Sequence, residues 1–493
     1  MKLAGRVPLC SPLGAQKNKG RYEEQDVKAS AIWITGLMVT LTIAGCSRQE
    51  EILAGERFGT RVPLSEAFPA DAGALTEEEV LVASQETVEA PDPLLSLRRE
   101  ASEDVSVPIS LPAATNRPSW THRGGDASHY AGHLQLGAAP ARVWSTRIGN
   151  GNSRKYRISS DPVIAGDRVF ALDSQAGVTA MSLAGDVLWR ADLTPASDRN
   201  SDASGGGLAY GDGALYVTTG FGRLTALDAA DGSVRWEQRF DAPITGAPTV
   251  NGDLVYVTAR DNTIAAVRTA NGRLAWSVNG APSNSTMITG AGPAAQGDTV
   301  VFPSGVSELI AARPEGVRVW AASLAGQRRG FAYAGISDIT GDPVIRNGAV
   351  YAATQSGRFA KLDQATGERI WTATDGAYSP GLPVGGSVFI VSDQGQLVRL
   401  DDATGEVIWT VDLPYYRRSS VRRLKSVTSH FGPILAGGQL VVGSDDGSLR
   451  FFSPEDGSLR YETKLPGGAA SMPAVANGTL YILSGNGQMH AFR

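Results

Sequence analysis

Cysteine is nearly absent from the sequence: Cys10 and Cys46 are the two residues of this type among 493. A disulfide framework, a zinc site with several cysteine ligands and a Cys-x-x-Cys redox motif are therefore excluded. The five histidines include no His-Glu-x-x-His pattern of a metalloprotease. His129 and His133 have i,i+4 spacing, but such a pair in a glycine-rich stretch more often lies on the surface, so we expect no metal site.

Neither sign of charge dominates, since 45 Lys and Arg accompany 50 Asp and Glu, for a formal net charge of −5. A dedicated nucleic-acid-binding protein needs a broad basic surface, so this class is excluded. Aromatic residues make up only 7%, but 42% of the residues are apolar, which is enough for a core. The 58 glycines have no collagen periodicity and predict many tight turns between short strands.

An apolar stretch, residues 29–45, follows a basic residue and is shorter than a typical membrane span. It ends in Leu-Thr-Ile-Ala-Gly before Cys46, and small residues before a cysteine resemble a bacterial lipobox, in which the thiol is lipidated and the signal cleaved. We predict a lipoprotein signal peptide at 1–45 and lipidation of Cys46. A short transmembrane anchor and an ordinary secretory signal are the alternatives. Ser47, where Asp would retain the protein at the inner membrane, suggests the outer membrane.

The next segment, residues 46–115, is strongly acidic. After Cys46 it holds five Arg and 14 Asp and Glu, without sustained periodicity. This composition predicts a flexible tether between the lipid and a globular body. The remaining residues, 116–493, are almost neutral, with 34 basic and 33 acidic side chains.

Residues 116–493 contain an internal repeat. Seven units begin with similar apolar runs, and each ends in an aromatic residue that has a glycine four positions upstream. The aromatic residues are Trp189, Trp236, Trp276, Trp320, Trp371, Trp409 and Tyr461. Turn signals divide each unit into four short alternating runs, which is the signature of a β-propeller blade.

An eighth unit, residues 472–493, stops after three strands, before any aromatic. The missing piece, Arg142-Val143-Trp144-Ser145-Thr146, precedes the first full unit. Closure of the last blade by this N-terminal strand would remove free sheet edges. We therefore predict an all-β fold, an eight-bladed β-propeller of four-stranded antiparallel blades.

The pattern G-x-L-x-A-L-D-x-x-x-G-x-x-x-W, clearest at 222–236, resembles the repeat of quinoprotein-type propellers. Together with the lipobox, the chain resembles the BamB family of outer-membrane assembly lipoproteins. The resemblance implies a lipid-anchored scaffold on the periplasmic side of the outer membrane, without cofactor or catalytic residue. Its partners would be a POTRA domain of a BamA-like barrel-inserting protein and other assembly lipoproteins, and it would assist outer-membrane protein insertion. The repeat alone is specific for the fold and weak for function.

Strand order predicts that the long connectors between blades lie on one face, opposite the short glycine turns. These connectors are 194–206, 277–291, 325–341 and 414–431. Long loops on a rigid ring usually carry binding residues.

Two connectors combine arginine with aromatic residues, the composition of interaction hot spots. The first contains Arg328, Arg329, Phe331, Tyr333 and Ile336. The second contains Tyr415, Tyr416, Arg417, Arg418, Arg422, Arg423 and Lys425, which suits an acidic protein or an anionic surface. Self-packing over the channel and a solvated charged loop are the respective alternatives.

The resemblance adds further residues, because BamB-family proteins dock through two neighbouring loops. Ile336-Ser337-Asp338 resembles the Ser-Asp element of one loop. Met287, Ile288 and Thr289 correspond to the other loop and keep its apolar character, but the family's arginine is missing. We predict that these residues bind the partner together with connector 325–341. Unfolded outer-membrane proteins could also pair with exposed strand edges.

A quinoprotein dehydrogenase is the enzymatic alternative. Such enzymes usually have vicinal cysteines, which this sequence lacks. Asp173, Asp228, Asp363 and Asp401 are plentiful carboxylates, but they recur at one repeat position after Leu, which favours a turn role in every blade over one catalytic site. A third alternative is an unrelated envelope scaffold or sensor lipoprotein.

Overall fold

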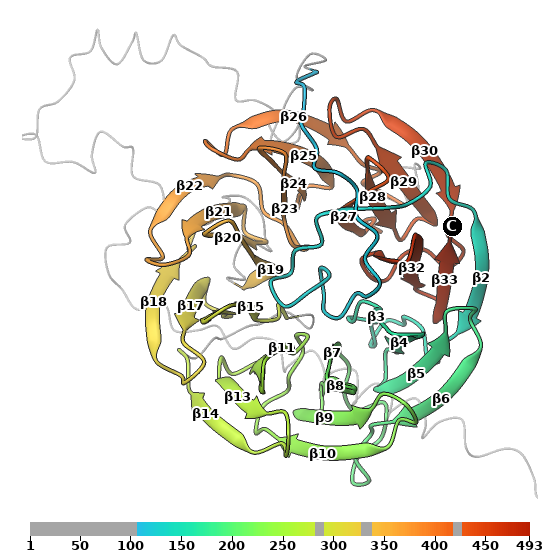
Figure 1. Ribbon diagram of the computed structural model, residues 1–493, viewed down its shortest axis with the longest axis vertical. Helices are drawn as coiled ribbons and strands as arrows, with labels where there is room; N and C mark the ends of the chain where they lie inside the picture. The colour runs from blue at the N-terminus through green and yellow to red at the C-terminus, as the bar shows by residue number, and fades with distance from the viewer. Residues whose placement is uncertain (1–105, 282–289, 327–337, 418–425) are drawn as a thin grey trace, which may run out of the picture. The chain divides into compact units, whose positions relative to one another are not determined.

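The computed structural model describes residues 106–281, 290–326, 338–417 and 426–493, all within one compact unit, Asp92–Arg493. In these residues the regular elements are strands, which form eight antiparallel sheets arranged as blades around a central axis (Figure 1). The predicted eight-bladed β-propeller is confirmed. The predicted signal peptide, Cys46 and most of the tether lie outside the described residues.

Each blade has four strands, numbered here from the axis outwards. Blades 1 to 4 comprise β3 (Val163–Ala165), β4 (Arg168–Leu172), β5 (Gly177–Ser182) and β6 (Val187–Asp192); β7 (Gly206–Gly211), β8 (Ala214–Thr219), β9 (Arg223–Asp228) and β10 (Val234–Arg239); β11 (Thr249–Asn251), β12 (Leu254–Thr258), β13 (Ile264–Arg268) and β14 (Leu274–Val278); and β15 (Ala294–Gln296), β16 (Thr299–Pro303), β17 (Glu308–Ala312) and β18 (Arg318–Ser323).

Blades 5 to 8 comprise β19 (Ile339–Arg346), β20 (Ala349–Thr354), β21 (Arg358–Asp363) and β22 (Arg369–Ala373); β23 (Leu382–Val384), β24 (Ser387–Val391), β25 (Gln396–Asp401) and β26 (Val407–Asp412); β27 (His430–Ala436), β28 (Gln439–Ser444), β29 (Ser448–Phe452) and β30 (Leu459–Lys464); and β31 (Ala474–Ala476), β32 (Thr479–Ser484), β33 (Gln488–Phe492) and β2 (Arg142–Arg147). A short strand, β1 (His133–Leu134), adds to β27 in parallel.

The N-terminal strand β2 closes the last blade, as predicted. It pairs antiparallel with β33, with Trp144 opposite Ala491 and Arg147 opposite Gln488. The described chain already packs on the ring at Val107, Ile109 and Leu111, which are partly buried. This is earlier than the boundary at 116 expected from the sequence.

Burial follows the position of a strand in its blade. Every residue of β8, β20 and β32 is buried, because neighbouring blades cover both faces of these inner strands. The outermost strands β10 and β30 instead alternate between exposed and partly buried residues. The alternating apolar runs of the sequence therefore encode radial position as well as strand structure.

The repeated aromatic residue joins adjacent blades. The indole Nε1 of Trp371 in blade 5 donates to the carbonyl of Asp402 in blade 6, at 2.9 Å. Gly405 in the same turn has φ of +76°, and a Cβ there would lie 2.6 Å from the Trp371 ring. Six further glycines meet the aromatic ring of the preceding blade in this way: Gly185, Gly232, Gly272, Gly316, Gly367 and Gly457. The constant offset between glycine and aromatic thus reflects a contact between blades.

Tyr461 breaks the pattern at the junction of blades 7 and 8. The outer turn of blade 8 is missing there, because its third and fourth strands, β33 and β2, come from opposite ends of the repeat region. Among the described residues, no glycine packs on the ring of Tyr461 as glycines do on the indoles of the other blades. An indole therefore has no matching turn at this seam, which explains why the seventh unit has tyrosine.

Every outermost strand carries a β-bulge directly before its aromatic residue. The register shifts between Val234 and Trp236 in blade 2 and between Leu459 and Tyr461 in blade 7, for example. The other six blades show the same shift. A bulge interrupts the hydrogen-bonding edge, which is a recognised protection against unwanted strand pairing.

Replacing Trp371 with alanine should destabilise the ring by about 3–5 kcal/mol, because the indole fills the wedge between blades 5 and 6. Urea unfolding of the full chain measures this loss. The matched control is Ile370→Ala at the bulge, where the side chain is 51% exposed and little change is expected. Equal effects of the two substitutions would contradict the packing role of the indole.

Candidate interaction surfaces

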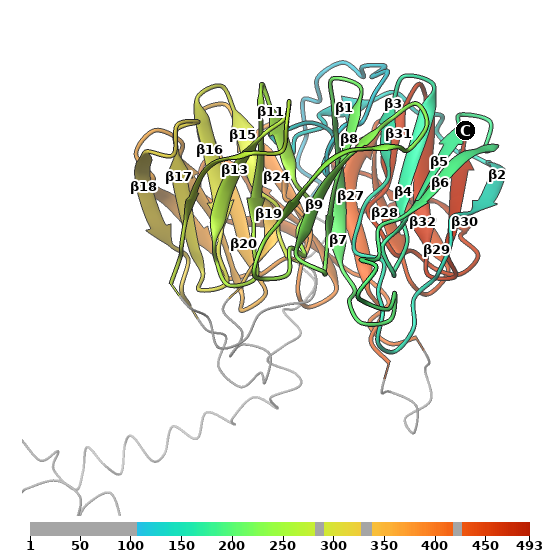
Figure 2. The ribbon, with the colours of Figure 1, turned by 90° about the horizontal axis from the view of Figure 1, so that it is seen from below.

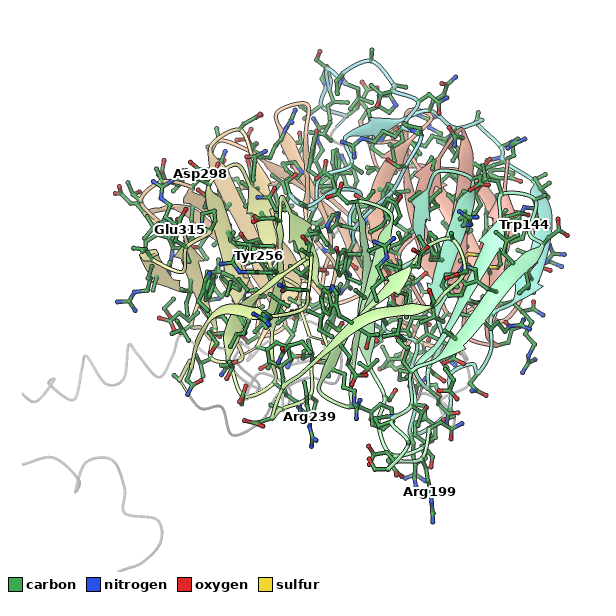
Figure 3. The ribbon with its side chains drawn as sticks, turned by 60° about the horizontal axis from the view of Figure 1, so that its bottom comes forward. Trp144, Arg199, Arg239, Tyr256, Asp298 and Glu315 are labelled. Carbon is green, nitrogen blue, oxygen red and sulfur yellow. The ribbon has the colours of Figure 1, made fainter. Side chains whose placement is uncertain are left out.

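The ring has two different faces. Figure 2 shows connector 194–206 on one face of the ring and the N-terminal segment before β2 on the opposite face. Figure 3 places Arg199 and Arg239 on this connector face, away from Asp298 and Glu315 at short turns of blade 4. The separation of connectors from glycine turns, predicted from strand order, is confirmed for these segments.

Most of the predicted partner-binding residues lie outside the described residues. This applies to Met287, Ile288, Thr289, Arg328, Arg329, Phe331, Tyr333, Ile336 and Ser337. Asp338 is described and is only 6% exposed. It lines a small pocket of about 40 Å³ on the connector side, together with Thr245, Asn262, Gly290 and Ser304. The described ends of the two predicted loops, at Gly290 and Asp338, therefore meet at one place.

The two described ends of connector 414–431 pair with each other through backbone hydrogen bonds. Arg417 N–H donates to Ser426 at 3.0 Å, and Thr428 N–H donates to Tyr415 at 2.9 Å. Tyr415 and Tyr416 stack edge to face with ring centroids 4.9 Å apart, and both are exposed. Arg417 pairs with Asp445 of blade 7 and is thus held to the ring. The other basic residues of this connector, Arg418, Arg422, Arg423 and Lys425, lie outside the described residues.

Connectors 149–160 and 194–206 are joined to each other. The Tyr156 hydroxyl donates to the carbonyl of Ser201 at 2.9 Å, and Arg157 N–H donates to Ser204 Oγ at 3.1 Å. The first connector, between β2 and blade 1, escaped the sequence analysis because it lies in no complete repeat. Together the two form a projection whose exposed side chains include Arg154, Lys155 and Arg199.

The centre of the ring is filled by residues 115–137, here called the axial segment (Figure 1). It exchanges hydrogen bonds with innermost strands or their turns in seven of the eight blades, in ring order. Its partners include Asn477 in blade 8, Ile164 in blade 1, Tyr210 in blade 2, Val250 in blade 3, Ala295 in blade 4, Ile345 in blade 5 and Gly437 in blade 7. The inner sheet edges are thereby paired with backbone or side-chain groups of the same chain.

Arg123 of the axial segment links two opposite blades. Its Nε lies 3.1 Å from Asp161 of blade 1 and 2.9 Å from Asp342 of blade 5. The remaining oxygens accept from the preceding blades, Asp161 from Met472 N–H and Asp342 from Gly292 N–H. Burial raises the pKa of Asp161 to about 6, even though Arg123 favours its charged form.

The histidines of the axial segment form hydrogen bonds with backbone groups of the blades. His122 accepts from Val250 N–H at 3.0 Å, and burial lowers its pKa to about 3. His129 Nδ1 lies 2.9 Å from the carbonyl of Pro343, and His133 Nε2 accepts from Gly438 N–H at 2.9 Å. The surface location expected for the pair His129 and His133 is wrong for His129, which is buried because the axial segment passes through the ring.

The recurring aspartates have the predicted turn role. Asp228, Asp363 and Asp401 each end a third strand and accept hydrogen bonds from backbone N–H groups two or three residues later. Asp173 also caps a turn, with Gln175 and Gly177 as donors. It follows the second strand, however, so its assignment to the same repeat position was wrong.

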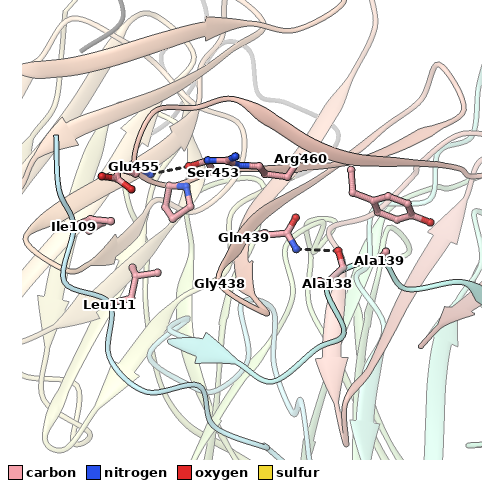
Figure 4. Close-up of a pocket in the computed structure, with 11 residues that line it drawn as sticks. Ile109, Leu111, Ala138, Ala139, Gly438, Gln439, Ser453, Glu455 and Arg460 are labelled. Carbon is pink, nitrogen blue, oxygen red and sulfur yellow. Dashed lines mark hydrogen bonds between the residues drawn. The ribbon is translucent and has the colours of Figure 1, made fainter. Parts of the chain in front are cut away.

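A larger pocket of about 620 Å³ lies between blade 7 and the N-terminal segment that leads to β2 (Figure 4). Ile109, Leu111 and Ala139 line it from the N-terminal segment, and Arg460 and Tyr461 line it from β30. Gln439 Nε2 donates to the carbonyl of Ala138 at 2.9 Å across its floor. The pocket is thus formed where the N-terminal segment passes over blade 7.

The outermost strands differ in charge. The first and third residues after each aromatic are exposed or partly exposed, and in five blades at least one is charged: Arg147 in blade 8, Arg190 and Asp192 in blade 1, Glu237 and Arg239 in blade 2, Asp412 in blade 6, and Glu462 and Lys464 in blade 7. In blades 3, 4 and 5 these positions hold Ser277 and Asn279, Ala321 and Ser323, and Thr372 and Thr374. These edges are uncharged only at the two compared positions, because Arg318 lies in β18 and Arg369 of β22 donates to the carbonyl of Ser323.

The described parts of the chain contain no helix with the length and apolar character needed to span a bilayer. Nor do these parts bring three or more His, Cys, Asp or Glu side chains together as a metal site would require.

Comparison with known families identifies the chain. A family model described as outer membrane protein assembly factor BamB matches residues 174–411 and 417–493, more than half of the chain. The chain belongs to the BamB family. It is 26% identical to outer membrane protein assembly factor BamB of Moranella endobia (strain PCIT) over 365 residues, which cover 71% of this chain and 90% of that relative.

Solved structures agree on the fold. BamB from Moraxella catarrhalis has a TM-score of 0.61 at 20% identity, covering 72% of this chain and all of that one. Quinohemoprotein alcohol dehydrogenase from Comamonas testosteroni has a TM-score of 0.60 at 16% identity, covering 77% of this chain and 81% of that one. These likenesses show a shared propeller and leave function to the residues.

The axis of this BamB-family chain does not fit a bound quinone at the level of Arg123. One nitrogen contacts carboxylates from blades 1 and 5, which are four positions apart in a ring of eight. The side chains of the protein therefore span the described channel at this level and leave no width for a planar ring system.

Replacing Arg123 with methionine should cost about 3–5 kcal/mol of stability, because Asp161 and Asp342 would remain buried without a cation. Urea unfolding at pH 7 measures the loss. The compensated variant, with Asp161→Asn and Asp342→Asn added, should recover most of it. A single variant within about 1 kcal/mol of the parent would contradict the axial ion cluster as a stabilising element.

Stability should fall as the pH falls from 7 to 5. His122 is neutral in both states above pH 6.5; below it the unfolded chain takes up a proton that the folded chain refuses until about pH 3. This costs about 2 kcal/mol at pH 5. His129, His430 and His490 act in the same direction because burial lowers their pKa.

Asp161 opposes this trend, since its raised pKa lets the folded state gain a proton near pH 6, before the unfolded state does. The stability lost through the four histidines exceeds the stability gained through Asp161. Urea midpoints at pH 7 and pH 5 test the balance, and His122→Gln should flatten the difference. An unchanged difference in that variant would show that His122 is not the titrating group.

Proposed function

We propose that this chain is a non-catalytic outer-membrane assembly factor. The observation that carries the proposal is the BamB family match over residues 174–493, with its short gap at 412–416. The filled axis supports a scaffold role, because the place where a propeller enzyme could hold a cofactor is spanned here by Arg123 and its two carboxylates.

The working surface is the connector face. It docks a POTRA domain of a BamA-like barrel-inserting protein through connectors 277–291 and 325–341. The proximity of Gly290 and Asp338 around one pocket supports joint action of the two loops. Arginine and aromatic side chains in connector 325–341 supply the residue types that dominate interface energies.

Lipidation at Cys46 tethers the ring to the periplasmic leaflet of the outer membrane. With roughly 60 residues, a flexible tether has a root-mean-square span of about 40–45 Å, so the ring can dock without straining the anchor. Other assembly lipoproteins join the same complex, and the assembly assists insertion of outer-membrane proteins.

The docking test uses the full chain and the purified periplasmic region of the barrel-inserting protein. The triple variant Arg328→Ala, Arg329→Ala and Phe331→Ala should bind at least about tenfold more weakly by calorimetry, because hot-spot side chains are removed. Arg157→Ala with Arg199→Ala, on the same face but in the other connectors, is the matched control.

Thermal midpoints should stay unchanged in both variants, since the substituted residues belong to connectors and not to blade strands. Undiminished binding by the triple variant would reject the assigned loops. An equal loss of affinity in the control variant would show that binding depends on the positive charge of this face and not on the assigned loop.

A further inference from the structure

The N-terminal segment meets the ring over blades 6 and 7. Residues 106–111, here called the strap, alternate between exposed and partly buried side chains, as an extended segment does when one of its faces lies on the ring. Ile109 and Leu111 pack against a core cluster that includes residues of both blades, and they also line the pocket over blade 7 (Figure 4). The strap carries no charged side chain. It therefore offers the ring apolar side chains and backbone carbonyls.

Arg399 of β25 holds these carbonyls. The residue is only 2% exposed, and its Nη1 donates to the carbonyl of Val107 at 2.6 Å and to that of Glu455 in blade 7 at 3.0 Å. Its Nη2 lies 3.5 Å from the carbonyl of Pro108, and its Nε donates to Ser387 Oγ of blade 6 at 3.0 Å. One guanidinium thus joins the strap to two blades, because its planar fork of donors reaches several acceptors at once.

An arginine at this position departs from the repeat. Arg399 lies opposite the repeated aromatic of its blade, Trp409. In five of the other seven blades the residue opposite the aromatic is an alanine: Ala180, Ala226, Ala266, Ala311 and Ala491. Lys361 of blade 5 is the other cation at this position, and it donates to the carbonyl of Asp402 within the ring. A blade therefore forms without a cation here, and the arginine coincides with the place that the strap crosses.

A glycine turn of blade 6 supports the other end of the strap. Gly385, between β23 and β24, has φ of +61°, and a Cβ there would lie 2.8 Å from the carbonyl oxygen of Ser110 and 2.9 Å from Ile109 Cγ1. The next residue, Gly386, has φ of +74° with no atom within 4 Å of its Cβ position. The absence of a side chain at Gly385 thus lets the strap lie directly on this turn.

We propose that Arg399 latches the strap and so sets the point from which the membrane tether leaves the ring. A pull along the tether is then borne by blades 6 and 7 and does not reach β2, whose pairing with β33 closes the ring. Chain ends stay ordered only where they are tied down, so a closing strand near the end of the fold gains from an anchor ahead of it. The inference rests on the proposed lipid anchor for its purpose, whereas the latch can be tested without the lipid.

Thermolysin cleavage of the full chain tests the latch, because this protease cuts before apolar residues and needs a locally opened segment. In the unsubstituted chain the protected ring fragment should begin no later than Val107. Two variants release the strap differently: Arg399→Ala introduces the residue that five other blades have, and Gly385→Ala places a Cβ against the strap. In both, cleavage before Ile109 or Leu111 should become at least about tenfold faster, since it follows the population of the opened strap.

Each of these variants has a matched control in the same chain. Lys361→Ala removes the equivalent cation of blade 5, and Gly386→Ala adds a Cβ at a similar φ but in open space. Both controls should keep the cleavage rate of the strap within about twofold of the unsubstituted chain. An unchanged rate in Arg399→Ala would overturn the latch. An equal rise in the controls would do the same, because general destabilisation would then explain the cleavage.

A pulling experiment tests where the load is borne. In the unlipidated full chain with Cys10→Ser, one handle is attached to Cys46 and the other to the thiol introduced by Glu315→Cys in blade 4. The first length step should be about 30 Å, the extended span of residues 106–114, and Arg399→Ala should lower its force. An unchanged force in that variant, or a first step several times longer, would show that the pull passes beyond the strap and would refute the proposal. Because this chain carries no lipid, such a failure is distinct from a failure of the proposed anchoring.

Discussion

The structure depends on filling the wedge between neighbouring blades. Blades diverge from the axis, so their outer ends must be joined by a large side chain. In seven of the eight outermost strands an indole does this by packing on a glycine turn of the next blade. In six of these seven the indole Nε1 also donates to a carbonyl of the next blade's turn, as Trp371 does to Asp402. A contact that repeats around a ring makes each blade's position depend on the next, and the N-terminal strand β2 completes the circuit.

The same geometry leaves a problem at the axis, where the innermost strands have unpaired edges around a narrow channel. The axial segment solves it with hydrogen bonds to strands or turns of seven blades and a guanidinium placed between two carboxylates. The polar groups at this centre form hydrogen bonds and ion pairs with one another, and these contacts hold the blades together. In the proposed function, binding therefore lies on the connectors.

The sequence predicts the ring well because its signals are local and repeated. Alternating apolar runs, a glycine at a fixed offset and an incomplete last unit are enough for blade number, strand order and closure. The sequence does not show that the glycine of one unit packs on the indole of the preceding blade, since a spacing within one unit does not reveal a contact between units. The axial segment was missed for a similar reason, because residues 115–137 have no repeat and their partners in the blades lie far along the chain, from Ile164 to Asn477.

The central claim is that the connector face carries the partner. Hydrogen–deuterium exchange of the full chain, alone and with the periplasmic region of a barrel-inserting protein, tests it without any substitution. The account predicts added protection in peptides covering 277–291 and 325–341, and unchanged exchange in the axial segment and in the short turns on the opposite face. Protection concentrated on those turns, with no change in the two connectors, would contradict it.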